Sequence, residues 1–259
     1  MACHNPRPAF VQKHPETGAV LLTFQYGAHK RYFRAPCGKC MGCRADQSLQ
    51  WSIRCLQESS LHKENSFVTL TLDDDHLTKV LEKKPLQDFL KRFRRDGTEV
   101  RYFACGEYGG ITRRPHYHAL LFGHDFREKA KHKKLVDNWK NGFISVDPLT
   151  PASVMYVCGY AQKKIEDPND TFVVMSRNPG IGRDFLAAYS DDMRRTGHVV
   201  IAGQKMPIPA RYKQWYEPLK EGTADYLMNE YRPLDDESLA ARAAKAISDL
   251  RAKNLKEKI

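Results

Sequence analysis

Two histidines in alternate positions, His116 and His118, are the residues whose type and spacing point most directly to chemistry. The stretch from Pro115 to Phe122 is otherwise aromatic or aliphatic, and no helix breaker follows until Gly123, so we expect a strand. Side chains alternate between the two faces of a strand, so both imidazoles project from one face and can share a metal ion. A pair of ordinary surface or core histidines has the same spacing and is the alternative interpretation.

Glu107 is the expected third ligand of this ion. Residues 100–105 predict a neighbouring strand, and the glycine-rich stretch at 106–110 returns the chain toward His116. The Glu107 carboxylate can therefore reach the histidine face, although a solvated turn residue would fit the same sequence. Two imidazoles and one carboxylate suit Mn²⁺ or, less naturally because it prefers oxygen ligands, Mg²⁺.

A predicted helix over residues 152–165, after an N-cap at Thr150, supplies hydroxyl groups. The side opposite its apolar stripe carries two tyrosines one turn apart and two lysines a turn further on: Tyr156, Tyr160, Lys163 and Lys164. Two partly buried aromatic residues of a basic helix are the alternative. The nearby histidine pair favours a chemical role for the phenols.

A second candidate metal site lies near the N-terminus. Three thiols repeat at every third residue with glycines between them, as in a metal-binding knuckle: Cys37, Cys40 and Cys43. Cys3 is the expected fourth ligand, with His4 beside it. We predict a structural Zn²⁺ that is remote from the catalytic chemistry. Three reduced cysteines in a turn and an iron–sulfur cluster are the alternatives.

The 259-residue chain carries a formal net charge of +11, which favours a polyanionic partner. Basic residues are interleaved with apolar ones over 79–101 and 127–140, so nucleic acid is the expected partner, and a solvated basic face is the alternative. We find no apolar segment of signal-peptide or membrane-spanning length. We therefore expect a cytosolic protein with no membrane partner and with reduced or metal-bound cysteines.

Hydrophobic periodicity predicts the elements that position these residues. We expect helices at 45–62, 85–93, 185–193 and from 239 onward, and strands at 19–24, 67–72, 143–146 and 172–175, with a hairpin over 199–209. We divide the chain into an N-terminal cysteine-rich segment and helix (1–62), a core (63–220) and a C-terminal helical extension (221–259).

Three segments resemble, in order, the motifs of the HUH endonucleases that initiate rolling-circle replication. They are FVTLT at 67–71, RPHYH at 114–118 and YVCGYAQKK at 156–164. Three more segments resemble the replication initiation proteins of small icosahedral single-stranded DNA phages, the gokushovirus branch of the Microviridae: CGKC at 37–40, GEYG at 106–109 and RNPGIG at 177–182. The resemblance covers most of residues 1–216. Gly159 stands where relatives often have a larger residue, which bears on the geometry between the tyrosines.

The resemblance implies an α+β fold, in which a central antiparallel sheet of about five strands is flanked by helices. It also implies that Tyr156 or Tyr160 attacks a phosphate of single-stranded origin DNA, forms a 5′-phosphotyrosine intermediate and later religates the strand. Lys163 and Lys164 would lower the phenol pKa or stabilise charge on the phosphate. The resemblance places this enzyme in the cytoplasm of a bacterial host.

The strand and its partners follow from the same interpretation. Tyr108, Tyr117 and Trp139 are candidates for stacking on bases, with core packing as the equal alternative. The chain contains no phosphate-binding G-x-x-x-x-G-K-[ST] motif, so strand separation would fall to a host helicase. Two other functions stay open at this point: a transposase or relaxase of the same superfamily, and a non-catalytic, zinc-stapled DNA-binding protein.

Overall fold

The computed structural model describes residues 3–13, 20–24, 32–95, 97–109, 113–166 and 171–216. The side chains of residues 11–13, 20–23, 32–33 and 162–166 lie outside this description. The expected C-terminal helical extension, 221–259, also lies outside it. The chain divides into two compact units, with one boundary between Asp46 and Gln47.

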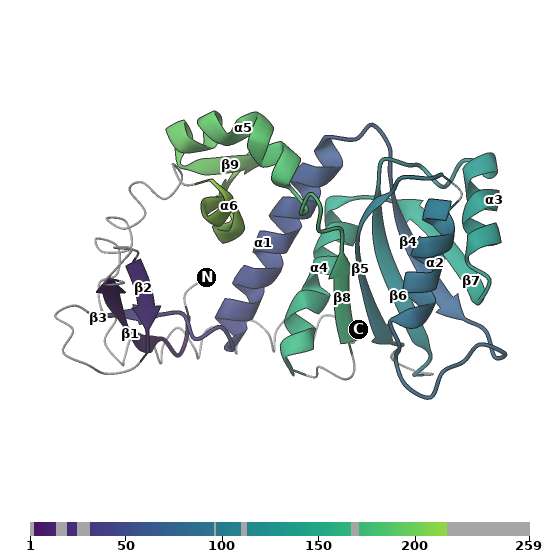
Figure 1. Cartoon of the computed structure of the whole chain (residues 1–259), viewed down its shortest axis with the longest axis horizontal. Helices are drawn as coiled ribbons and strands as arrows, with labels where there is room; N and C mark the ends of the chain where they lie inside the picture. Colours follow the sequence, from purple (N-terminus) through teal and green to yellow (C-terminus); the bar gives the residue numbers. More distant parts are fainter. Residues whose placement is uncertain are drawn as a thin grey trace, which may run out of the picture. The chain divides into compact units, whose positions relative to one another are not determined.

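The N-terminal unit contains a small antiparallel sheet in the order β2-β1-β3, formed by β1 (Arg7–Lys13), β2 (Val20–Thr23) and β3 (Tyr32–Ala35) (Figure 1). The sequence predicted only the middle of these three strands, because the other two lack a clear alternation of apolar and polar residues. α1 (Met41–Ser60) starts four residues earlier than expected and therefore includes Cys43.

The second unit is built on a five-stranded antiparallel sheet in the order β7-β4-β6-β5-β8. The strands are β4 (Asn65–Leu72), β5 (Arg101–Tyr108), β6 (Pro115–Phe122), β7 (Gly142–Pro148) and β8 (Thr171–Met175). The expected α+β fold is confirmed, with the histidine strand β6 at the centre of the sheet. The alternation in β4 also matches, because Val68, Leu70 and Leu72 are fully buried.

One face of this sheet packs against α2 (Lys84–Arg95) and α3 (Lys129–Asn138), as Figure 1 shows. Tyr117 and Trp139 lie in this core, with ring centroids 5.8 Å apart and almost no exposure. These two rings therefore cannot stack on DNA bases, and the expectation that they hold the strand is wrong. Burying such large rings contributes more to the core than any exposed contact would.

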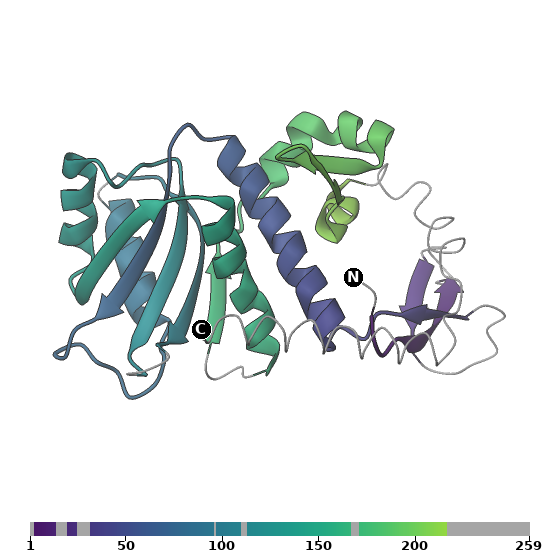
Figure 2. The same ribbon diagram turned by 180° about the vertical axis from the view of Figure 1, so that it is seen from behind.

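The opposite face of the sheet packs against α4 (Pro151–Glu166) and α1 (Figure 2). The apolar stripe of α4 is buried as predicted, with Val154, Val157 and Cys158 fully inaccessible. β5 and β6 supply Phe103, Cys105 and Leu120 to the same core. This face also carries the histidine pair.

A third core joins α1 to the last described elements, α5 (Arg183–Thr196), β9 (His198–Ile201), β10 (Gln204–Pro207) and α6 (Ala210–Trp215). Arg54 of α1 donates two hydrogen bonds to the carbonyl oxygen of Ile181, at 3.0 and 2.9 Å. The buried Glu58 accepts a hydrogen bond from the Gly182 amide at 2.7 Å and pairs with Arg101. α1 is thus fixed to this part of the unit by paired charges as well as by packing. No helix in the described ranges is long and apolar enough to cross a bilayer.

Candidate active site

Strand register brings the candidate ligands onto one face of the sheet. His116 lies directly opposite Glu107 on β5, and His118 lies directly opposite Thr69 on β4. Directly opposed residues of antiparallel strands point to the same face, and so do residues two apart on one strand. The face of β6 that carries the histidines is therefore also the face of Glu107, as the sequence predicted.

His118 and Glu107 are in direct contact. His118 Nε2 lies 3.0 Å from Glu107 Oε1, and both side chains are largely buried. The other ring nitrogen of His118, Nδ1, lies 3.0 Å from the hydroxyl of Thr69. Phe67 stacks on the same imidazole, with ring centroids 5.8 Å apart. β4 therefore holds the ring of His118 by one hydrogen bond and one aromatic contact.

α4 places both tyrosine hydroxyls at the same carboxylate oxygen. The Tyr156 hydroxyl lies 3.1 Å from Glu107 Oε1 and 3.4 Å from His118 Nε2. The Tyr160 hydroxyl also donates to Glu107 Oε1 and lies 2.8 Å from the Tyr156 hydroxyl. Two phenols, one imidazole and one carboxylate thus converge, although they come from distant parts of the sequence.

The two tyrosines differ in exposure. Tyr156 is 48% exposed, whereas Tyr160 is only 2% exposed. Tyr160 borders the apolar stripe of α4 and packs into the core that covers this face of the sheet. A large substrate can therefore reach the Tyr156 oxygen more directly than the Tyr160 oxygen.

The electrostatics of the cluster keep the proton on the phenols. Burial acts to raise the pKa of Glu107, but hydrogen bonds from the imidazole and the two phenols outweigh it and hold that pKa below the ordinary carboxyl value. Burial raises the pKa of Tyr160 well above its ordinary value, and the hydrogen bond to Glu107 adds to the effect. Burial likewise raises the pKa of Tyr156, which the charge of Glu107 reinforces. Either phenol needs a proton acceptor to become a nucleophile at neutral pH.

His116 stands apart from this network. Its Nδ1 is buried and has no hydrogen-bond partner among the described residues. Gly109 leaves room for the ring, since a Cβ at that position would lie 3.0 Å from His116 Nε2. An unpartnered buried nitrogen beside a His118–Glu107 pair fits a divalent cation bound by these three side chains. Their ligand atoms are spaced more widely than in a closed metal site, since within the described ranges only a cysteine cluster has its ligand atoms all within 4.8 Å of one another.

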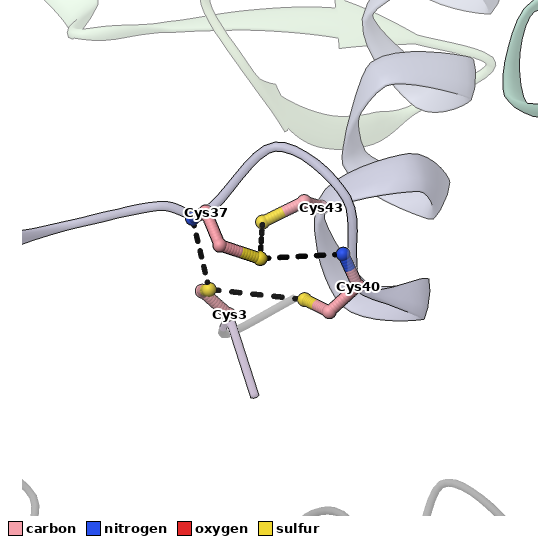
Figure 3. Close-up of side chains that lie close together, drawn as sticks. All are labelled: Cys3, Cys37, Cys40 and Cys43. Carbon is pink, nitrogen blue, oxygen red and sulfur yellow. Dashed lines mark hydrogen bonds between the residues drawn. The ribbon is translucent and has the colours of Figure 1, made fainter. Parts of the chain in front are cut away.

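That cysteine cluster consists of the four predicted residues, Cys3, Cys37, Cys40 and Cys43 (Figure 3). It belongs to the N-terminal unit. Lys163 and Lys164 lie in the last part of α4, where the side chains are outside the described part of the structure. Their expected role stays a prediction.

A basic hollow of about 290 Å³ lies at the end of the sheet, one residue pair beyond Glu107 and His116. It is lined by Leu77, Thr78, Lys79, Tyr108, Arg113, Arg114 and Pro115. The Arg113 guanidinium lies over the Tyr108 ring, 4.6 Å from its centroid. Cations next to an aromatic ring are typical of contacts with single-stranded nucleic acid. The basic composition pointed to such a surface, but the sequence did not locate Lys79 and Arg113 in it.

Comparison with known proteins establishes the family. Residues 65–165, from β4 to α4, match a family model described as replication-associated protein, of the ORF2 type. The replication-associated protein VP4 of Bdellovibrio phage phiMH2K is 31% identical over 214 residues, which cover 71% of this chain and 68% of that protein. The chain belongs to the family of replication-associated proteins of small single-stranded DNA phages. The predicted resemblance is thereby confirmed at the family level.

Two further relatives have the same description. The replication-associated protein ORF2 of Spiroplasma virus 4 is 32% identical over 225 residues, covering 74% of this chain and 69% of that protein. The replication-associated protein ORF4 of Chlamydia phage 1 is 27% identical over 232 residues, covering 78% of this chain and 58% of that protein. These relatives favour a phage replication protein over a transposase or a plasmid relaxase.

Among solved structures, the chain is similar to the N-terminal nuclease domain of non-structural protein 1 from Minute virus of mice. The match covers 50% of this chain and 72% of that one, at 15% identity and a TM-score of 0.24. A TM-score of this size does not by itself establish a common fold.

Proposed function

We propose that this protein initiates rolling-circle replication by nicking single-stranded origin DNA with a tyrosine and later religating the strand. The observation that carries the proposal is the convergence of the Tyr156 and Tyr160 hydroxyls on Glu107 Oε1 beside His118. Phenols in this arrangement have little value for stability alone, since each requires a partly buried polar group to be satisfied. They are well arranged to attack a phosphorus atom.

Tyr156 is the first nucleophile in this proposal, because it is the exposed phenol. Its oxygen bonds to phosphorus while the bond from phosphorus to the 3′ oxygen breaks, so the 5′ phosphate stays on the protein and a free 3′ hydroxyl leaves. Glu107 Oε1 accepts the hydrogen bond of the attacking phenol and is in position to take its proton. A divalent cation held by His116, His118 and Glu107 would screen the charge of the phosphate and polarise it.

Tyr160 is the second nucleophile in this proposal. The phosphotyrosine diester conserves the energy of the broken bond, so rejoining needs no ATP. Once Tyr156 holds a 5′ end, the second phenol, one turn away and 2.8 Å from the first, is available for the regenerated origin. Moving DNA onto the 2% exposed Tyr160 requires the segment around α4 to shift.

The substrate is single-stranded or extruded at the cut, since a duplex would keep the phosphate away from buried groups on a sheet face. The basic hollow beside Tyr108 supports this choice, because it can contact phosphates and one base next to the cleaved bond. A host helicase would separate the strands. The enzyme would act in the cytoplasm of the infected bacterium.

The test uses the purified full chain, a labelled single-stranded origin oligonucleotide and Mn²⁺ or Mg²⁺. We expect a protein–DNA adduct that survives denaturation in the wild type. Tyr156→Phe should lose most of the adduct formed in the first cleavage, Tyr160→Phe should keep that adduct but lose strand transfer, and the double variant should form none. An adduct in the double variant would contradict the tyrosine mechanism. Failure of the wild type with every oligonucleotide of a broad set would instead favour a DNA-binding protein without catalysis.

A further inference from the structure

The four-cysteine cluster gathers thiols from two separate parts of the N-terminal unit (Figure 3). Cys3 precedes β1, Cys37 and Cys40 lie between β3 and α1, and Cys43 lies in the first turn of α1. Cys40 Sγ is 3.7 Å from Cys3 Sγ, and Cys37 Sγ is 4.0 Å from Cys43 Sγ. These separations are far longer than a disulfide bond, which is about 2.05 Å.

The separations match one metal ion bound by four sulfurs. A Zn–S bond of about 2.3 Å in a tetrahedral site places neighbouring sulfurs about 3.8 Å apart. In an iron–sulfur cluster the thiolates bind different irons and stand farther apart than the two distances seen here. We propose that Cys3, Cys37, Cys40 and Cys43 bind a single Zn²⁺ as a closed, structural four-thiolate site.

Backbone amides around the sulfurs are arranged for thiolate charge. The amide of Cys37 donates to Cys3 Sγ at 3.2 Å, that of Cys40 to Cys37 Sγ at 3.3 Å, and that of His4 to Cys40 Sγ at 3.3 Å. Four thiolates and one Zn²⁺ carry a net charge of about −2, which such donors stabilise.

Gly38 makes this amide arrangement accessible to the chain. Its φ of +73° lies in the left-handed region, and a Cβ there would meet no atom within 4 Å. The glycine is therefore required by backbone conformation rather than by lack of space. The sequence Cys37-Gly38-Lys39-Cys40 thus builds the turn that returns the Cys40 amide to the Cys37 sulfur.

The N-terminal unit has little other means of holding itself together. Within its described side chains, the buried apolar residues are only Cys3, Ala9, Phe10 and Ala35. Segments with so small a core usually depend on a disulfide or a metal. The bound zinc fixes the residues before β1 to the turn that starts α1, so it stabilises this unit independently of the chemistry on the sheet.

The experiment is elemental analysis of the full-length protein after gel filtration. We expect about one zinc per chain, with Cys40→Ser losing it and Cys40→His, which restores a nitrogen ligand, keeping it. Co²⁺ exchanged into the wild type should give thiolate-to-cobalt charge-transfer absorption and tetrahedral d–d bands. His118→Ala is the matched control, because it alters the other candidate metal site and should leave the zinc in place.

Three results would overturn the proposal: wild-type protein without zinc, wild-type protein with iron in its place, or a cobalt spectrum without thiolate bands. Measurements on the wild type decide the matter even if a cysteine variant does not fold. Because none of these readouts involves DNA cleavage, failure of the zinc site and failure of the nicking mechanism are separate outcomes.

Discussion

At the scale of single residues, one carboxylate oxygen organises the candidate site. Glu107 Oε1 is within hydrogen-bond distance of His118 and of both phenols. The sequence located these residues by type, since alternation placed the histidines on one face and the Gly-rich segment returned Glu107 to it. It did not predict the burial of Tyr160, because that depends on how α4 packs on the sheet. It also did not predict that His116 lies outside the hydrogen-bonded group.

Replacing Glu107 by Gln keeps the shape of the side chain but removes its charge. We expect adduct formation to fall about 100-fold or more, because the attacking phenol loses its proton acceptor. In metal-free protein the pKa of Tyr156 should also fall, since the negative charge of Glu107 is one cause that raises it. NMR titration of ring-labelled tyrosine, with Tyr156→Phe to assign the signal, measures this. An unchanged or higher tyrosine pKa would contradict the assigned electrostatics.

Thr69 is expected to position His118 for metal binding. Its hydroxyl can accept the Nδ1 proton, which leaves Nε2 free to bind a cation beside Glu107. Thr69→Val preserves the shape and removes the hydroxyl, so Mn²⁺ should bind about 10- to 100-fold more weakly by calorimetry. Thr69→Ser restores the hydroxyl and should bind as the wild type does. Equal affinity in the valine and serine variants would rule out this role.

At the scale of elements, hydrophobic periodicity worked where one face of an element is buried. β4 and α4 follow their predicted patterns, as the buried Val68 and Val157 show. Periodicity failed where burial depends on distant partners. α3 was not predicted from its basic sequence, and α6 is only six residues long. The basic residues around Trp139 favoured a DNA contact, yet ring contacts with Phe89 and Tyr117 place it in the core.

The turn between β5 and β6 is expected to hold DNA through the basic hollow. Lys79→Ala combined with Arg113→Gln should weaken binding of single-stranded DNA and reduce the salt slope by about 0.7 for each phosphate that is no longer bound. Fluorescence anisotropy over a range of salt concentrations measures both quantities. The control is Lys133→Ala, which removes an exposed cation paired with Asp137 on α3. If the control weakens binding equally, net charge rather than the hollow is responsible.

At the scale of the whole molecule, two candidate metal sites belong to separate compact units. The four cysteines lie before Gln47, and the histidine face lies after it. Composition alone predicted a nucleic-acid partner from the charge of +11, but it could not separate a structural from a catalytic metal. Ligand type made that distinction, because thiolates favour zinc whereas imidazole with carboxylate favours a harder ion.

Sites in separate units should affect stability independently. Cys40→Ser should lower the thermal stability of the full chain, because the N-terminal unit loses its metal, whereas His118→Ala should mainly lower Mn²⁺ affinity. The double variant should lose the sum of the two single losses in unfolding free energy, within about 0.5 kcal/mol. Calorimetry on the four proteins tests this additivity. A coupling well above that value would mean that the two metal sites communicate.

The shared oxygen of Glu107 also bears on how the reaction is ordered. Both phenols donate to the same atom, and one oxygen cannot take up two protons in a single event. We therefore expect the two tyrosines to react in turn, with one waiting until the other has finished. Such alternation would prevent both strand ends from being captured at once, and so would protect a circular genome from being linearised midway through copying.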